Sequence, residues 1–347
     1  MPHPSAEDVP VSPERGPLRS LDNGFFGPDS VSWKVWTSPT SLIGFQRAVV
    51  LEHFDPPLAA AVADSGGIYQ DPHGRLDQTL AYFLTVAVGD SRTVIQAAEF
   101  LMRIHAKATG VEPITGKRYS ANNPESQLWI HLTGWHSVLK CYELYGPGRL
   151  SKADEDRYWA ECRVAAELQT CDPADVPRNR EEVKAYFEKV RPQLCSSERA
   201  YRGMHYLLYP PLKKVGFRIW AASRFTAVLS IHSLPMWMRR TGGFHQWRLI
   251  DFGIRLAQPF IRMGTRIAKM PRVGIPVITP VAPVTGRVLR QHYRSAAPED
   301  SAVVTPSRGR ELHGTMGSRR TTTDANANAN AEQLTAVSPA PATGPAR

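Results

Sequence analysis

The stretch SRTVIQAAEFLMRIHAKATG, residues 91–110, decides the fold, because its apolar residues recur at helical spacing. His105 lies within an apolar stripe whose other members are Val94, Ala98, Leu101, Met102 and Ala108. An imidazole on a buried face needs a partner, because an unpaired buried polar group costs about 1–3 kcal/mol. Two partners for the His105 imidazole are possible. One is a backbone carbonyl, the commoner partner of a core histidine, and the other is the iron of a haem packed against the apolar wall.

Patterns of the same kind extend through most of the chain. Residues 41–53 and 74–88 each carry apolar positions at helical spacing, and Gly110 is expected to end the helix that contains His105. Asn123-Pro124 predicts a helix start, with the helix running to about Tyr145. Ser151 and Asn179 are further N-cap candidates, the second in a capping box with Glu182. Strand signals are sparse, and the β-branched stretch 273–284 is interrupted by prolines. The sequence therefore predicts an all-α fold.

Composition divides the chain into four parts. Residues 1–22 and 296–347 are poor in apolar side chains, and both are predicted to be disordered, the first as an arm and the second as a tail. Residues 23–243 are long enough for one helical domain with a sizeable core. Residues 244–295 are predicted to form a basic amphipathic appendage packed on that domain.

Cysteine usage and charge exclude several classes of protein. The four cysteines show no C-x-x-C spacing, which disfavours a zinc knuckle or a redox pair and favours a reduced, cytoplasmic location. The sequence shows no signal peptide and no apolar run long enough to span a membrane. Residues 201–298 hold sixteen Lys/Arg and one acid, Asp251, in a chain of net charge +10. Because no nucleic-acid-binding module is recognisable, this basic region favours an anionic membrane surface and argues against nucleic acid.

The appendage contains a repeating basic pattern within residues 244–270. Arg248, Arg255, Arg262 and Lys269 recur every seven residues, and Pro259 predicts a kink. One interpretation is a docked helix whose basic stripe is solvated. The other is an interfacial helix that attaches a peripheral protein to an anionic membrane.

Two further groups of side chains are candidates for a site. Arg75, Gln78 and Thr79 lie at positions i, i+3 and i+4 and therefore share one helix face, either as site residues or as an ordinary solvated surface. A guanidinium suits a carboxylate such as a haem propionate, and a hydroxyl can donate to a bound oxygen species. His131 lies among apolar positions of its helix, where a core histidine is the commoner interpretation and a distal base or a substrate-pocket donor is the other. The remaining histidines show no spacing typical of a metal triad.

These segments occur in a recognisable order. In chain order, the pattern comprises Arg75 and Thr79, His105 and Gly110, YSANNP (119–124), WIH (129–131), and SLP (233–235) ahead of Arg239 and Arg240. From about residue 33 to residue 243 the chain resembles the catalytic domain of the rubber oxygenases (latex-clearing proteins). That family also contains the membrane-associated oxygenase of mycophenolic acid biosynthesis.

The resemblance implies a single helical domain with a globin-like core and a b-type haem. His105 corresponds to the proximal histidine and is the implied iron ligand, and we expect its second ring nitrogen to donate to the Leu101 carbonyl. Arg75 and Thr79 match an Arg-x-x-Lys-Thr pattern near the distal side of the haem. Gln78 stands where that family has a lysine, and a neutral amide can only hydrogen-bond where an amine can occupy the sixth iron position.

The leading hypothesis is a haem b-dependent oxygenase acting on a hydrophobic small molecule such as an isoprenoid or a polyketide. His105 would hold the iron, O2 would bind opposite it, and Arg75, Gln78, Thr79 and His131 would shape the site. One alternative is a non-catalytic haem- or lipid-binding protein at a membrane surface. Another is a haem-free tailoring enzyme that uses His105 and His131 as acid–base groups.

Overall fold

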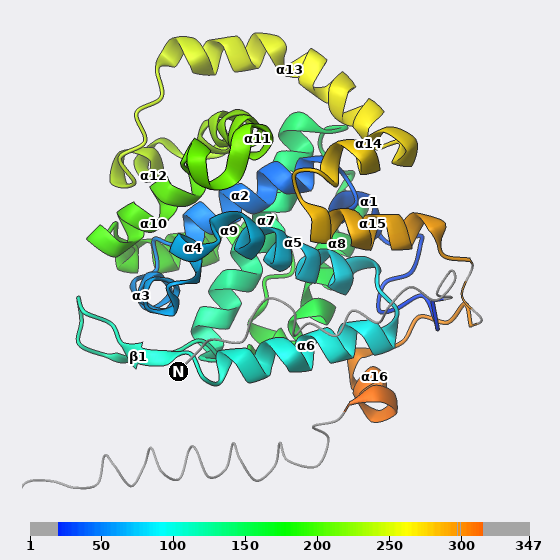
Figure 1. Ribbon diagram of the computed structural model, residues 1–347. Helices are drawn as coiled ribbons and strands as arrows, with labels where there is room; N and C mark the ends of the chain where they lie inside the picture. The colour runs from blue at the N-terminus through cyan, green and yellow to red at the C-terminus, as the bar shows by residue number, and fades with distance from the viewer. Residues whose placement is uncertain (1–19, 297, 299, 315–347) are drawn as a thin grey trace, which may run out of the picture.

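Two buried helices, α2 (Thr40–Glu52) and α7 (Pro124–Tyr145), lie side by side at the centre of the fold (Figure 1). The computed structural model describes residues 20–314 except 297 and 299. The other helices are α1 (Val31–Trp36), α3 (Pro56–Ser65), α4 (Gly67–Gln70), α5 (Pro72–Val88), α6 (Ser91–His105), α8 (Lys152–Ala166), α9 (Arg180–Val190), α10 (Glu198–Leu208), α11 (Leu212–Ser233), α12 (Met236–Thr241), α13 (Arg248–Ala268), α14 (Pro271–Ile278), α15 (Pro283–Arg294) and α16 (Pro306–His313). Short 3-10 turns lie at Pro173–Asp175 and Arg191–Gln193. The predicted all-α fold is confirmed.

A glycine sets the spacing of the central pair. A Cβ atom at Gly44 of α2 would lie 2.6 Å from the Cα of Val138 and 2.9 Å from the carbonyl oxygen of Ser137, both in α7. Any side chain at this position would therefore push the two backbones apart. Because α2 is covered on nearly every side, even its polar residues Gln46 and Arg47 are buried.

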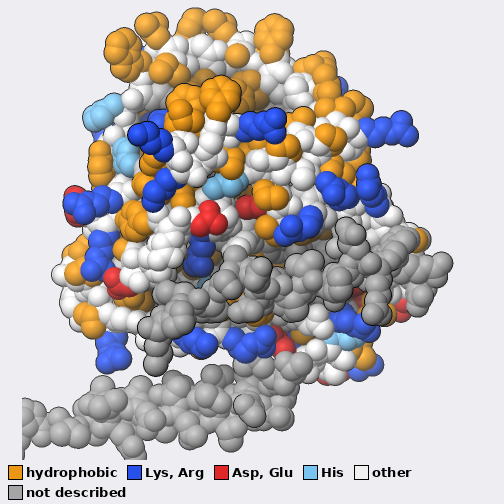
Figure 2. Space-filling model, viewed as in Figure 1, with side chains coloured by type: hydrophobic (Ala, Val, Ile, Leu, Met, Phe, Trp, Pro, Cys, Tyr) orange, Lys and Arg blue, Asp and Glu red, His pale blue; other side chains and the backbone are white. Residues whose placement is uncertain are grey.

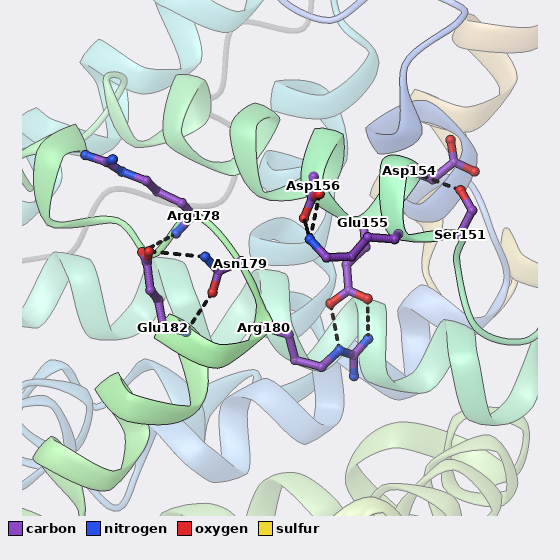
Figure 3. Close-up of polar contacts among 9 residues, drawn as sticks. Ser151, Asp154, Glu155, Asp156, Arg178, Asn179, Arg180 and Glu182 are labelled. Carbon is purple, nitrogen blue, oxygen red and sulfur yellow. Dashed lines mark hydrogen bonds and ion pairs between the residues drawn. The ribbon is translucent and has the colours of Figure 1, made fainter.

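The helix starts predicted from capping residues are confirmed, two of them visible in Figure 3. The side-chain oxygen of Asn123 accepts from the backbone N–H groups of the first turn of α7, and Ser151 Oγ accepts from Asp154 N at 3.1 Å. Asn179 Oδ1 accepts from Glu182 N at 2.9 Å. In each case the cap satisfies N–H groups that the helix itself cannot pair, which fixes where the helix begins.

The predicted end of the His105 helix is wrong. α6 ends at His105, and Gly110 belongs to a two-stranded hairpin, β1 (Thr109–Val111) and β2 (Arg118–Ser120), in which it pairs with Tyr119. A Cβ atom at Gly110 would lie 2.6 Å from the Tyr119 hydroxyl oxygen, so a glycine is needed under that ring. The same hydroxyl donates to Asp64 Oδ2 at 2.8 Å, which ties the hairpin to α3.

The segments predicted as arm and tail are partly ordered, which corrects the expected boundaries. Asp22 is buried and its carboxylate accepts from the backbone N–H and the hydroxyl of Ser91. Residues 301–304 pair with the backbone at 23–24, and α16 then packs on α6. These contacts could not be predicted from local sequence patterns, because they join segments near the two ends of the chain. Residues 1–19 and 315–347, the rest of both segments, lie outside the described residues.

α15 covers α5 and is held by a carboxylate. Asp77 of α5 is buried, and its two oxygens accept from the backbone N–H groups of Val284 and Thr285 at 2.7 and 2.9 Å. These groups belong to the first turn of α15, where unpaired N–H groups and the helix dipole favour a negative charge. Asp77 therefore caps a helix about two hundred residues further along the chain.

The predicted basic helix exists as α13, and it docks on the protein with Ile254 buried. Its polar side contacts the protein: Gln258, Arg262 and Thr265 donate to the carbonyl groups at the end of α7. Its apolar side faces outward, and this surface, called here the α13 apolar face, comprises Leu249, Phe252, Leu256, Phe260 and Met263, each 55–79% exposed. Figure 2 shows these orange side chains along the upper edge, where α13 runs in Figure 1. Arg262 thus contacts the end of α7 while remaining exposed, as Arg248 and Arg255 are.

One acid fixes the start of α13. Asp251 Oδ1 accepts from His232 Nδ1 and Gln246 Nε2, and Asp251 Oδ2 accepts from Arg239 Nη1, all at 2.7 Å. Burial alone would raise the pKa of Asp251, but these three hydrogen bonds outweigh it and hold the pKa below its usual value. The one acid of the basic region 201–298 therefore joins α13 to α11 and α12.

Candidate active site

His105 lies at the last position of α6, half-buried, against the first turns of α7. Its Nδ1 atom is 3.3 Å from Nε2 of Gln127, and the same amide nitrogen donates to the Ala121 carbonyl. Because the amide nitrogen faces a carbonyl, it must be a donor toward His105 as well, so Nδ1 accepts and the proton sits on Nε2. The expected partner of His105 was the Leu101 carbonyl. The structure places the Gln127 amide there instead, because the helix ends at His105 and α7 packs across it.

The imidazole of His105 is neutral over the physiological range. Burial, followed by the positive charge of Arg75, lowers its pKa from 6.5 to about 4. Arg75 of α5 thus acts on His105 of α6 through its charge. A neutral imidazole is the form that can ligate a metal, although here its unprotonated Nδ1 accepts from the Gln127 amide.

The other two members of the α5 group lie closer to solvent. Gln78 is exposed, as is Arg75, and Thr79 is half-buried with its hydroxyl donating to the Arg75 carbonyl at 2.9 Å. The Thr79 hydroxyl is therefore engaged with its own helix. Of the three, Arg75 is the residue that the structure links to His105.

His131 occupies the core position that was the commoner interpretation from sequence. Its side chain is buried, its Nε2–H donates to the Cys162 carbonyl at 2.7 Å, and its ring lies against Trp135. Burial lowers its pKa to about 4 despite that hydrogen bond. A histidine with this pKa is a poor general acid at neutral pH, which disfavours the acid–base alternative for His105 and His131.

Metal sites built from several protein ligands do not occur in the described part of the chain. Within residues 20–314, no group of three or more His, Cys, Asp or Glu side chains could hold an ion. The four cysteines are free; Cys141, Cys162 and Cys171 are buried, and Cys195 is partly buried. A cofactor that needs one protein ligand, as haem does, is compatible with this arrangement, and His105 offers that ligand.

The chain matches one protein-family model over residues 33–263. That model is described as ER-bound oxygenase mpaB/B'/Rubber oxygenase, catalytic domain. The chain belongs to this family. The oxygenase domain thus begins in α1 and ends within α13, and it includes Arg75, His105 and Gln127. No curated protein and no solved structure matches the chain.

Membership makes the protein an enzyme of the oxidoreductase class, an oxygenase. The match bears out the family resemblance drawn from the ordered motifs. Sequence reasoning missed Gln127, the side chain that holds the His105 ring. A signal was present, since Gln127 follows the Asn123-Pro124 helix start by about one turn, at the end of α7 that meets α6.

Proposed function

We propose that this oxygenase holds a b-type haem through His105 and oxidises a hydrophobic small molecule with O2. The observation that carries the proposal is the half-buried imidazole of His105 at the end of α6, whose pKa is lowered by burial and then by the charge of Arg75. Haem needs one axial nitrogen donor and cations for its propionates, and these two side chains offer both. The bound haem iron would supply the activation of O2.

The donor set fits a haem in its chemistry, and one detail defines the role of Gln127. In the arrangement described above, the amide donates to Nδ1 and the proton sits on Nε2. Ligation through Nε2 requires the opposite tautomer, in which Nδ1–H needs an acceptor. The Gln127 Oε1 could accept from Nδ1–H only if the amide turned, and that turn would break its hydrogen bond to the Ala121 carbonyl, so ligation through Nε2 requires a local rearrangement around Gln127. Gln127 is thus proposed as the positioning residue that selects which nitrogen of His105 is free.

The test is the absorption spectrum of the purified protein expressed with a haem supply, beside the His105→Ala variant. We expect a Soret band in the parent and its loss in the variant, with helical circular dichroism unchanged. The His245→Ala variant is the matched control, because His245 is exposed and should retain the band. A parent without haem, or a folded His105→Ala variant that keeps the band, would contradict the proposal.

We also propose that the enzyme works at an anionic membrane surface, where an apolar substrate such as an isoprenoid or a polyketide dissolves. No helix among residues 20–314, as far as they are described, is long and apolar enough to span a membrane. The support comes from the α13 apolar face and from the excess of Lys/Arg in residues 201–298. An amphipathic helix with exposed Leu and Phe and flanking cations is typical of an interfacial helix.

Vesicle sedimentation tests the membrane proposal. The full chain should pellet with vesicles of phosphatidylcholine and phosphatidylserine, less with phosphatidylcholine alone, and less again at high salt. The Leu256→Ser/Phe260→Ser double variant should lose at least about ten-fold in affinity, because each side chain buries apolar area worth about 1.5–3 kcal/mol when fully inserted. Ile114→Ser is the control, since Ile114 is 54% exposed but lies in the hairpin.

The same surface could instead pair two copies of the chain. Light scattering measures the molar mass of the parent and of the double variant, and so separates membrane attachment from dimer formation. A dimer that the double variant converts to a monomer, without vesicle binding by the parent, would refute membrane attachment through α13.

A further inference from the structure

A cavity of about 420 Å³ opens between α7, α9 and α12. Its walls combine apolar and aromatic side chains, among them Trp159, Phe187 and Trp237, with several cations. A volume of this size holds a small organic molecule. Neither the family match nor the haem proposal assigns a role to it.

Arg47 of α2 is the charged group at the inner end of this cavity. Its side chain is 3% exposed, although an arginine is rarely buried without an acidic partner. Its Nη1 donates to Ser137 Oγ at 2.6 Å and lies 3.4 Å from His136 Nδ1, and its Nε has no partner among the described residues. A buried guanidinium keeps its charge, and here its only polar contacts within the described residues are neutral.

The other cations of the cavity are only partly paired with acids. Arg180 is neutralised by Glu143 and Glu155, and Lys184 pairs with Glu188. In the part of the chain that the structure describes, Lys140, Arg47 and Arg191 form no ion pair, and all three line the cavity. The Arg191 guanidinium lies over the Trp237 ring, 4.7 Å from its centroid. The cavity therefore carries uncompensated positive charge next to aromatic walls.

His136 completes the polar end. Burial, and then the charges of Arg47, Lys140 and Arg180, lower its pKa well below the usual value, so the ring is neutral. Because Nδ1 accepts from Arg47, the proton is on Nε2, and this N–H is the remaining donor of a side chain that lines the cavity. The ring lies against that of Phe187, with centroids 4.9 Å apart and planes tilted by 51°.

We propose that this cavity binds a small carboxylic acid with an aromatic or apolar body. The carboxylate would lie against the Arg47 guanidinium, with Lys140 and His136 as further donors, and the body would lie among Trp159, Phe187 and Trp237. A carboxylate supplies the one thing that the buried guanidinium lacks, an anionic acceptor for a charge-assisted hydrogen bond.

This binding site is separate from the proposed haem site. Gln127, which contacts His105, precedes His136 by nine residues on α7, a separation of about 14 Å along the helix axis at 1.5 Å per residue. The proposal does not depend on haem, and its test is independent of the absorption spectrum.

Isothermal titration calorimetry of the full chain tests it with 2-naphthoate and with 2-naphthalenemethanol, an alcohol of closely similar shape without the charge. We expect naphthoate to bind at least about ten-fold more tightly than the alcohol. Arg47→Met should remove most of that preference, about 10- to 100-fold in naphthoate affinity. Lys140→Met should weaken naphthoate by about three-fold, whereas the matched Lys189→Met, on α9 outside the cavity, should not.

The outcomes separate the site from an ordinary apolar cavity. Equal affinity for the acid and the alcohol would overturn the proposal, as would naphthoate binding that neither the Arg47 nor the Lys140 change alters. If Arg47→Met does not fold, Arg47→Lys keeps the charge without the planar fork and decides the question. A weakened but measurable preference for the acid in that variant supports the assignment, and an unchanged affinity refutes it.

Discussion

Arg180→Met should lower the free energy of unfolding by about 2–3 kcal/mol, less than the roughly 3–5 kcal/mol of a fully buried ion pair, because the Arg180 side chain is 35% exposed and solvent screens its charge. Arg180 Nε donates to Glu155 Oε1 at 2.6 Å, and its Nη2 donates to Glu143 Oε1 at 2.5 Å (Figure 3 shows the contact with Glu155). The side chains of Glu143 and Glu155 are only 10% and 5% exposed, so two carboxylates would be left in the interior without a cation. Urea unfolding at pH 7.5 measures the effect.

The matched control for this change is Lys152→Met. Lys152 forms an exposed ion pair with Asp156 in the first turns of α8, and such pairs contribute at most about 1 kcal/mol. The triple variant Arg180→Met/Glu143→Gln/Glu155→Gln should recover part of the lost stability, because the stranded charges are gone. An Arg180→Met variant no less stable than Lys152→Met would contradict the assignment of this cluster as a structural ion pair.

Stability should also fall steeply as the pH drops from 6.5 toward 4. His131 has a folded-state pKa of about 4, held down by burial, against an ordinary value of 6.5. Above pH 6.5 His131 is neutral in both the folded and the unfolded state, so it makes no pH-dependent contribution to the free energy of unfolding. Below pH 6.5 His131 becomes protonated in the unfolded chain but stays neutral in the folded core. The free energy of unfolding therefore decreases until the pH reaches the folded-state pKa. For His131 alone, this linkage amounts to about 2 kcal/mol at pH 5.

His131→Gln isolates that contribution. The amide keeps a donor for the Cys162 carbonyl but cannot titrate, so the difference in unfolding free energy between pH 7.5 and pH 5 should shrink by about 2 kcal/mol. His245→Gln, at an exposed position, should leave the pH profile as it is in the parent. Parallel profiles for the parent and His131→Gln would show that His131 does not titrate between these pH values.

The helices of this protein could be predicted because their signals are local. Asn123, Ser151 and Asn179 each satisfy backbone groups two or three residues away, so their sequence context is enough to place α7, α8 and α9. The end of α6 could not be placed in this way. Gly110 is a common helix terminator, but here it is required by the Tyr119 ring across a hairpin, a contact that no helix pattern reveals.

The parts of the site that were missed depend on contacts between distant residues. Arg47 is one cation in an apolar stretch, and its surroundings become unusual only when Ser137 and His136, about ninety residues away, lie beside it. The side of α13 that docks could not be predicted either, because its partners are carbonyl groups at the end of α7, more than a hundred residues earlier. The heptad of basic residues gives no information on those acceptors.

The cap that Asp77 provides for α15 has a consequence for the order in which the protein can mature. The ribosome releases Val284 some 207 residues after Asp77, which takes roughly 10–40 s at ordinary elongation rates. During that interval α5, which carries Arg75, lacks its covering helix, and α16, which packs on α6, has yet to be made. The two helices that present Arg75 and His105 therefore reach their final surroundings only near the end of synthesis. If the chain binds haem as proposed, a haem captured by the nascent chain would meet α5 and α6 before α15 and α16 cover them, and one captured later would enter the finished fold.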